Sequence, residues 1–227
     1  MPLTYLELEY FFSTQRLQRY LSACTSDHAK AVGLYKANIR ISQAFHPLLC
    51  VIETVLRNRL DSILSAQFND TDWILNQRHH FMSNRLLGPR FFLREEVNRT
   101  KDRLRRAGYT VNSGKIIADL NFGFWTALFE KKHFALLRGK PIQIFTALPS
   151  TKKRIDLYNN LSQIRDLRNR INHNEPICFA GNNISFKNTL DTYKVIRRTI
   201  LWLDKRLPPF LKEFDNTIKE IRAGQQI

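Results

Sequence analysis

The spacing of apolar residues constrains the fold of this chain more than any other feature of its sequence. After Pro47, apolar side chains recur every three or four positions, which is the period of one face of an α-helix. This stripe comprises Leu48, Val51, Ile52, Val55, Leu56, Leu60, Ile63 and Leu64. Strand patterns are scarce, and only residues 181–186 fit a turn or a short strand. The sequence therefore predicts an all-α fold, arranged as a single domain over residues 1–227.

Helix boundaries follow from the same period and from capping residues. The predicted helices cover residues 13–24, Ser26 or Asp27 to about Ala44, a segment from Pro47 onward, 92–107, 114–130, 150–173, 188–206 and 209–222. Pro47 is placed at a helix start, because the missing N–H of proline has no intrahelical partner there. Gly108 is placed just beyond a helix end, because glycine readily adopts the left-handed conformation common at that position. In the helix before it, Leu93, Val97 and Leu104 are expected to face the core.

The chain is strongly basic. Its 36 Lys and Arg residues exceed its 20 Asp and Glu residues, which gives a formal net charge of +16. This excess favours a polyanionic partner, with nucleic acid first and an acidic membrane surface second, although charge can also serve solubility alone. Basic residues are dense within 78–106, which fits a track for a phosphate backbone or an ordinary solvated helix face. The candidate RNA contacts are Arg99, Lys101, Arg103, Arg105, Arg106, Arg165 and Arg170.

Several features predict a cytoplasmic protein without a membrane partner. The longest apolar region, residues 116–129, is interrupted by Asp119 and Asn121 and is too short and too polar to span a bilayer. The N-terminus has no basic start and carries Glu7 and Glu9, unlike a signal peptide. The widely spaced, odd-numbered cysteines, which suggest buried and reduced thiols, are Cys24, Cys50 and Cys178.

Residues 165–176 carry the side chains best suited to chemistry. Arg168 is followed by four residues and then by His173, and the segment closes on Pro176. Arginine can stabilise charge on a phosphate oxygen, and histidine both accepts and donates a proton near neutral pH. On a strongly basic chain, this pair suggests RNA cleavage without a metal ion. A histidine at a helix end is also often only a cap for the last carbonyl groups.

A helical wheel separates this motif from the core. The apolar face carries Leu157, Leu161, Ile164, Leu167 and Ile171. Asn169 and His173 lie four residues apart on the opposite face, and Arg165 is beside them. Pro176 requires the helix to end close to His173. A polar catalytic group on this face has to be exposed or to meet a partner, and a two-fold dimer would join two such faces.

RNA supplies its own nucleophile, because the 2′-hydroxyl lies next to the phosphate. In the predicted mechanism His173 removes the 2′-hydroxyl proton, Arg168 stabilises the phosphate oxygens, and Asn169 orients His173 or hydrogen-bonds the phosphate. The expected products are a 2′,3′-cyclic phosphate and a 5′-hydroxyl, and DNA is spared. The alternative is a non-catalytic RNA-binding module in which these residues hold a phosphate or cap the helix. A basic membrane-surface protein ranks last, because no isolated basic amphipathic helix with aromatic anchors is apparent.

Three segments of the sequence resemble one family. Arg168-Asn169-Arg170-Ile171-Asn172-His173 resembles the Arg-x4–6-His signature of the HEPN superfamily, and residues 167–177 are similar to the corresponding segment of the Abi-like abortive-infection proteins of bacteria. Residues 52–60 and 116–125 resemble two earlier segments of that family. The resemblance is strongest over residues 45–180, where these segments follow in the expected order.

The resemblance implies an all-α, HEPN-like helical bundle with additional helices, and a homodimer with a composite active site. It also implies a metal-independent endoribonuclease, used in phage defence (abortive infection) or as a toxin and restrained by an antitoxin protein or RNA. Arg168, Asn169 and His173 take the catalytic roles. Glu53 and Arg57 take supporting roles, although they fit a surface ion pair equally well. Some members of the superfamily bind RNA without cutting it, so the non-catalytic HEPN module stays open.

Other patterns fail as functional sites. Residues 108–116 are similar to a phosphate-binding loop, but five residues separate the glycines and Ile116 stands where a magnesium-binding hydroxyl is required. His79 and His80 are adjacent instead of one helical turn apart, and no Cys-x2-Cys is present, so no metal site or cofactor is expected. The aromatic residues 122–125 are expected to pack in the core in preference to stacking on RNA bases.

Overall fold

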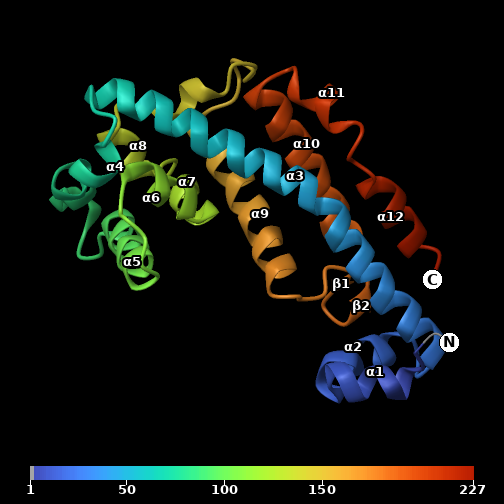
Figure 1. Cartoon of the computed structure of the whole chain (residues 1–227). Helices are drawn as coiled ribbons and strands as arrows, with labels where there is room; N and C mark the ends of the chain where they lie inside the picture. The colour runs from blue at the N-terminus through green and yellow to red at the C-terminus, as the bar shows by residue number, and fades with distance from the viewer. Residues whose placement is uncertain (1–2) are drawn as a thin grey trace. The chain divides into compact units, whose positions relative to one another are not determined.

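A computed structural model describes residues 3–227, and the described chain is predominantly helical (Figure 1). Its α-helices are α1 Tyr5–Phe12, α2 Thr14–Ala23, α3 His28–Phe68, α4 Trp73–Asn76, α5 Phe92–Arg106, α6 Ser113–Asp119, α7 Phe122–Ala127, α8 Lys131–Leu136, α9 Arg154–Asn172, α10 Lys187–Leu203, α11 Leu207–Leu211 and α12 Thr217–Gly224. Short 3-10 helices cover Gln77–His79, Phe81–Ser83, Arg85–Leu87 and Lys140–Ile144. The predicted all-α class is confirmed.

The only strands in residues 3–227 form a small hairpin, which agrees with the weak strand signal at residues 181–186. Strand β1 (Phe179–Ala180) pairs antiparallel with β2 (Asn183–Ile184). Gly181 has a φ of +57° in the turn between them, a value that favours glycine. The hairpin lies against α2, because the Arg19 guanidinium donates to the Gly181 carbonyl at 2.5 Å and stacks over the Phe179 ring.

Contacts divide the chain into two compact units. The first unit comprises Met1–Cys50, Asp166–Arg198 and Pro208–Ile227, and the second comprises Val51–Arg165 and Thr199–Leu207. The helices α3, α9, α10 and α11 therefore contribute residues to both units. That residues 1–227 act as one domain stays a prediction.

The first unit has its core along the N-terminal part of α3, where Leu34, Ile41 and Phe45 are fully buried. Helices α1 and α2 lie side by side near the start of α3 (Figure 1). Two polar contacts fix other segments to α3: the Ile177 N–H donates to Asn38 Oδ1 at 2.8 Å, and the Thr217 hydroxyl donates to the Ala44 carbonyl at 3.0 Å. Because these groups are buried, leaving either one unpaired would be costly.

The second unit is built on aromatic packing. The fully buried side chains include Trp73, Trp125 and Phe129. Residues 122–125, considered above as either core or stacking platform, supply Phe122, Phe124 and Trp125 to this core, and each is at most 2% exposed. They therefore have no free ring face for an RNA base in this conformation, and core packing is confirmed.

An ion pair between Arg59 and Asp204 lies at the end of α10 in the second unit. The Arg59 guanidinium lies 2.7 Å from the Asp204 carboxylate and donates to the Leu203 and Ile144 carbonyls at 2.6 and 2.9 Å. Arg206 also lies 2.8 Å from Asp204. A single arginine thus joins α3 to the C-terminal end of α10 and to the last residue of the 3-10 helix Lys140–Ile144.

The predicted helix break before Pro47 is wrong, because α3 runs without interruption from His28 to Phe68. Proline removes one intrahelical hydrogen bond, but its fixed φ is compatible with a helix. Ala44 and Phe45 before it, and Leu48 and Leu49 after it, are all buried. Their packing outweighs the lost bond and keeps the helix continuous.

Two further boundaries differ from the prediction. The expected helix 114–130 is split into α6 and α7, because Asn121 Oδ1 accepts from the Phe124 N–H at 3.0 Å and starts a new helix. The expected helix 209–222 is replaced by α11 and α12, and Pro208 and Pro209 lie inside α11. Gly108 is confirmed as a helix terminator: it has a φ of +77°, and the Tyr109 N–H donates back to the Leu104 carbonyl at 3.0 Å. Leu93, Val97 and Leu104 are buried as expected.

Helix α3 is also the one helix in residues 3–227 that is long and apolar enough to cross a membrane. Length and composition give only weak support for a membrane span, because the core helix of a soluble protein passes the same test. Leu34, Ile52 and Leu60 are fully buried along α3, as a core helix requires. The absence of a membrane partner remains a prediction.

Candidate functional site

The Arg–His motif occupies the C-terminal end of α9. Asn169 and His173 are exposed and one turn apart, and the His173 N–H donates to the Asn169 carbonyl at 2.9 Å. Arg168 is half-buried between this exposed face and the core. On the other face Leu157, Leu161, Ile164 and Leu167 are buried, which confirms the wheel for these positions. Ile171, expected in the core stripe, is half-buried and lines a pocket.

The end of α9 is set by Asn174 instead of by Pro176. Asn174 has a left-handed φ of +54°, and its N–H donates to the Ile171 carbonyl at 3.0 Å. The Glu175 N–H donates to the Arg170 carbonyl at 2.8 Å. These two bonds form a Schellman motif, which satisfies the last carbonyl groups of the helix through the backbone. His173 is therefore the C-cap residue, and its imidazole is not needed to bond those carbonyls.

Arg170, a predicted RNA contact, is engaged in this helix end. Its guanidinium donates to the Pro176 carbonyl, and its Nε lies 3.7 Å from the Glu175 carboxylate. The side chain therefore holds the turn that follows α9. Arg165, the other RNA contact predicted on this helix, is half-buried.

The basic residues of α5 form a second candidate surface, in the second unit. Arg99, Arg103, Arg105 and Arg106 are exposed, and Lys101 is half-buried. Arg99 lies 2.6 Å from the Glu96 carboxylate and Arg103 lies 2.7 Å from Asp119, so part of this charge is neutralised within the chain. Partial burial lowers the pKa of Lys101, and the nearby charges of Arg78 and Arg105 lower it further.

Glu53 and Arg57, predicted as supporting residues, lie on α3 in the second unit and are half-buried. The Arg57 guanidinium donates to the Ala118 carbonyl of α6 at 3.1 Å and to the Asn58 side chain at 3.4 Å. Arg57 thus holds the end of α6 against α3. Arg168, Asn169 and His173 belong to the first unit, so the structure assigns these two sets of predicted residues to different units.

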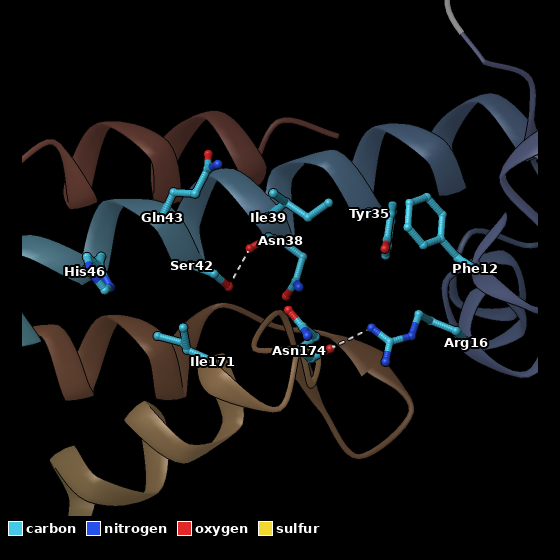
Figure 2. Close-up of a pocket in the computed structure, with 10 residues that line it drawn as sticks. All are labelled: Phe12, Arg16, Tyr35, Asn38, Ile39, Ser42, Gln43, His46, Ile171 and Asn174. Atoms are coloured by element: carbon cyan, nitrogen blue, oxygen red, sulfur yellow. Dashed lines mark hydrogen bonds between the residues drawn. The ribbon is translucent and has the colours of Figure 1, made fainter. Parts of the chain in front are cut away.

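A pocket of about 810 Å³ lies in the first unit beside the end of α9 (Figure 2). Its lining comes from α1, α2, α3 and the end of α9: Phe12, Arg16, Tyr35, Asn38, Ile39, Ser42, Gln43, His46, Ile171 and Asn174. Ile171 and Asn174 bracket His173 in the chain, so the pocket adjoins the candidate catalytic helix end. Figure 2 shows Asn38 pointing from α3 toward Asn174, which Arg16 approaches from α2.

The sequence carries one signal for this pocket, in addition to the motif at the end of α9. Asn38, Ser42 and His46 are spaced four residues apart, so they form a polar line along α3 beside the buried positions Leu34, Ile41 and Phe45. Polar residues at helical spacing within an apolar stripe indicate a site that the core does not cover. Arg16 and Phe12 had no such signal, because their place at the pocket depends on how α1 and α2 fold back onto α3.

No group of three or more His, Cys, Asp or Glu side chains within residues 3–227 is arranged to hold a metal ion. Comparison with protein-family models, with curated proteins and with solved structures finds no match for this chain. The resemblance to Abi-like HEPN proteins therefore rests only on the sequence segments quoted for it.

Proposed function

We propose that this protein is a metal-independent endoribonuclease of the Abi-like HEPN type. The observation that carries the proposal is the end of α9, where His173 is exposed at a backbone-satisfied C-cap. Asn169 is exposed one turn earlier, and Arg168 stands beside it. A net charge of +16 supports RNA as the substrate.

In the proposed reaction His173 accepts the proton of an RNA 2′-hydroxyl, and the oxygen attacks the adjacent phosphorus. The bond from phosphorus to the 5′-oxygen breaks, and that oxygen takes up a proton from an imidazolium or from water. Arg168 and Asn169 stabilise the charge that develops on the phosphate oxygens. The products are a 2′,3′-cyclic phosphate and a 5′-hydroxyl, and DNA is not cut because it has no 2′-hydroxyl.

The resemblance also implies where the enzyme acts, its oligomeric state and its biological role. The enzyme acts as a cytoplasmic homodimer in which two copies of the α9 end form one composite site. It cuts RNA during phage defence or as a toxin, and an antitoxin protein or RNA restrains it. The exposure of Asn169 and His173 supports this arrangement, since a face without core contacts is available to a second copy.

Cleavage of total cellular RNA in EDTA tests the proposal. The wild-type protein is expected to give discrete fragments with cyclic-phosphate ends, and His173→Ala is expected to give none while its RNA affinity and thermal midpoint stay unchanged. His80→Ala is the matched control, because His80 is also exposed but lies after α4, far from His173 in the sequence. Cleavage by His173→Ala at the wild-type rate would exclude His173 as the general base.

A second candidate is a non-catalytic RNA-binding HEPN module. It is favoured by one observation: no residue among 3–227 hydrogen-bonds the His173 imidazole, so nothing within the described chain orients it for proton transfer. In that case folded wild-type protein binds RNA in a salt-sensitive manner and produces no fragments under any condition that preserves binding.

A further inference from the structure

The pocket beside the end of α9 contains a buried side chain with an unused donor. Asn38 is only 5% exposed, and its Oδ1 accepts from the Ile177 N–H at 2.8 Å. A backbone N–H can only donate, so this bond fixes which end of the Asn38 amide carries the oxygen. The amide NH₂ group therefore belongs on the pocket side, and no residue among 3–227 accepts a hydrogen bond from it. This donor is open to solvent in the pocket, where an acceptor of a ligand can take the place of water.

The other walls of the pocket define the chemistry that fits. Phe12 is 42% exposed and supplies an aromatic face, and Tyr35, which is 8% exposed, packs against Phe12 and Tyr20 with ring centroids 5.5 and 5.3 Å away. The exposed Arg16 donates one N–H to the Asn174 carbonyl at 3.3 Å, which leaves further donors of its guanidinium for an anion. No Asp or Glu side chain lines the pocket. A flat ligand with a carbonyl oxygen and a negative charge satisfies all three features.

We infer that this pocket binds a nucleobase together with its phosphate. The base lies against Phe12 and Tyr35, a carbonyl oxygen of the base accepts from the Asn38 amide, and the phosphate pairs with Arg16. Uracil, cytosine and guanine offer a carbonyl oxygen for this bond, whereas adenine offers only ring nitrogens, so AMP tests whether the acceptor is a carbonyl. The volume of about 810 Å³ is within the usual range of small-molecule pockets.

The biological role of this pocket rests on the proposed ribonuclease function, because Ile171 and Asn174 place the pocket next to His173. A base held there comes from the RNA chain and selects the sequence beside the cut. The same chemistry would also admit a free nucleotide that acts as an effector. RNA and a free nucleotide present the same base and phosphate to the pocket. They differ in whether the nucleotide is part of a polymer.

Calorimetry with UMP, GMP and AMP, and with short single-stranded RNA, tests the pocket, and His173→Ala protein in EDTA prevents cleavage during the measurement. Asn38→Asp is the decisive variant, since it keeps an oxygen for the Ile177 N–H and replaces the donor by an acceptor. Phe12→Ala and Arg16→Gln remove the exposed aromatic wall and the anion contact. Tyr10→Ala and Lys36→Gln are their matched controls, because both residues are exposed and neither lines the pocket.

Asn38→Asp, Phe12→Ala and Arg16→Gln are each expected to weaken binding of UMP or GMP about tenfold, while AMP binds more weakly than either in the parent protein. The two control variants keep the parent affinity. If RNA binding falls in parallel, the base belongs to RNA; if only mononucleotide binding falls, the ligand is a free nucleotide. Folded Asn38→Asp protein with the parent affinity for every probe would overturn the inference, as would the absence of binding by the parent protein.

The two proposals fail in different ways. If wild-type protein cuts RNA and Asn38→Asp cuts the same positions at the same rate, the pocket inference is wrong and the ribonuclease stands. If no RNA is cut but UMP or GMP binding depends on Asn38, the pocket stands and the ribonuclease fails.

Discussion

At the scale of single residues, burial separates the three cysteine thiols into two classes. Cys24 and Cys178 are buried, and Cys50 is exposed on α3, so the prediction of uniformly buried thiols is wrong for Cys50. Burial raises the pKa of Cys178 to about 12 and also raises that of Cys24. The thiolate is the reactive form of cysteine. The two buried thiols are therefore unreactive for two reasons: reagents cannot reach them, and their raised pKa keeps them protonated.

Thiol labelling at neutral pH is therefore expected to modify one cysteine in the folded protein. Cys50 reacts with a soluble disulfide reagent at the rate of a free thiol, and Cys24 and Cys178 react only after unfolding in denaturant. Cys50→Ser removes the fast phase and leaves the other two unchanged. Rapid reaction of three thiols in native buffer would contradict the buried positions.

The carboxylate of Asp204 makes the stability of the protein depend on acid pH. Hydrogen bonds from Arg206, and then from Arg59, hold the pKa of Asp204 well below its ordinary value. A carboxyl group with a lowered folded-state pKa contributes stability above its unfolded pKa of about 4, and loses it as the pH falls toward the folded value.

Asp204→Asn is accordingly expected to lower the thermal midpoint at pH 7, with a smaller difference from wild type as the pH approaches 3. Asp191→Asn serves as the control, because within the described residues 3–227 Asp191 pairs only with Lys194, at 3.4 Å on the surface, and should change little. Equal losses for Asp204→Asn at pH 7 and pH 3 would show that its contribution is not ionic.

At the scale of elements, the end of α9 depends on one residue in a left-handed conformation. Asn174 has a φ of +54°, which glycine adopts freely, asparagine tolerates and alanine adopts at a cost. Asn174→Ala is expected to lower the free energy of unfolding by about 1 kcal/mol, and Asn174→Gly is expected to leave it unchanged or slightly higher. Urea denaturation measures both. Equal destabilisation by the two substitutions would mean that the asparagine side chain, and not the backbone conformation, holds the helix end.

At the scale of the whole molecule, the net charge of +16 acts on any polyanion before a specific contact forms. Internal ion pairs at Arg99 and Arg103 reduce the charge available on α5, whereas Arg105 and Arg106 are exposed without a carboxylate partner among residues 3–227. The positive charge of α5 that is available to a polyanion is therefore smaller than the number of its Lys and Arg residues suggests.

RNA affinity is expected to fall linearly with the logarithm of salt concentration, and Arg105→Gln is expected to make the slope shallower by about one released counterion. Arg99→Gln, whose charge is paired within the chain, should change the slope less. Fluorescence anisotropy with a short single-stranded RNA provides the measurement. An affinity that does not depend on salt would argue against phosphate contacts altogether.

Some features of the fold and of the candidate site could be predicted from local sequence patterns. The buried positions of α9 follow a period that depends only on helix geometry, and Gly108 ends α5 through its own conformational freedom. Pro47 and Asn121 could not be read in this way. At Pro47 long-range packing overrides a local breaker, and at Asn121 a side-chain cap divides an apolar run whose period alone predicts one helix.

The sequence by itself determined the helical class, the exposed face that carries Asn169 and His173, and the basic character of the chain, because each depends on spacing or composition along one helix. Only the tertiary structure decided that Asn174 ends α9, that Arg170 is engaged in the turn, and that Phe12, Arg16 and Asn38 meet around one pocket. Asn174 and Arg170 act locally, but spacing alone does not show which residue adopts the left-handed conformation. The pocket requires residues from α1, α2, α3 and the end of α9 to approach one another. Such approach is set by the burial of whole helix faces, which no local pattern encodes.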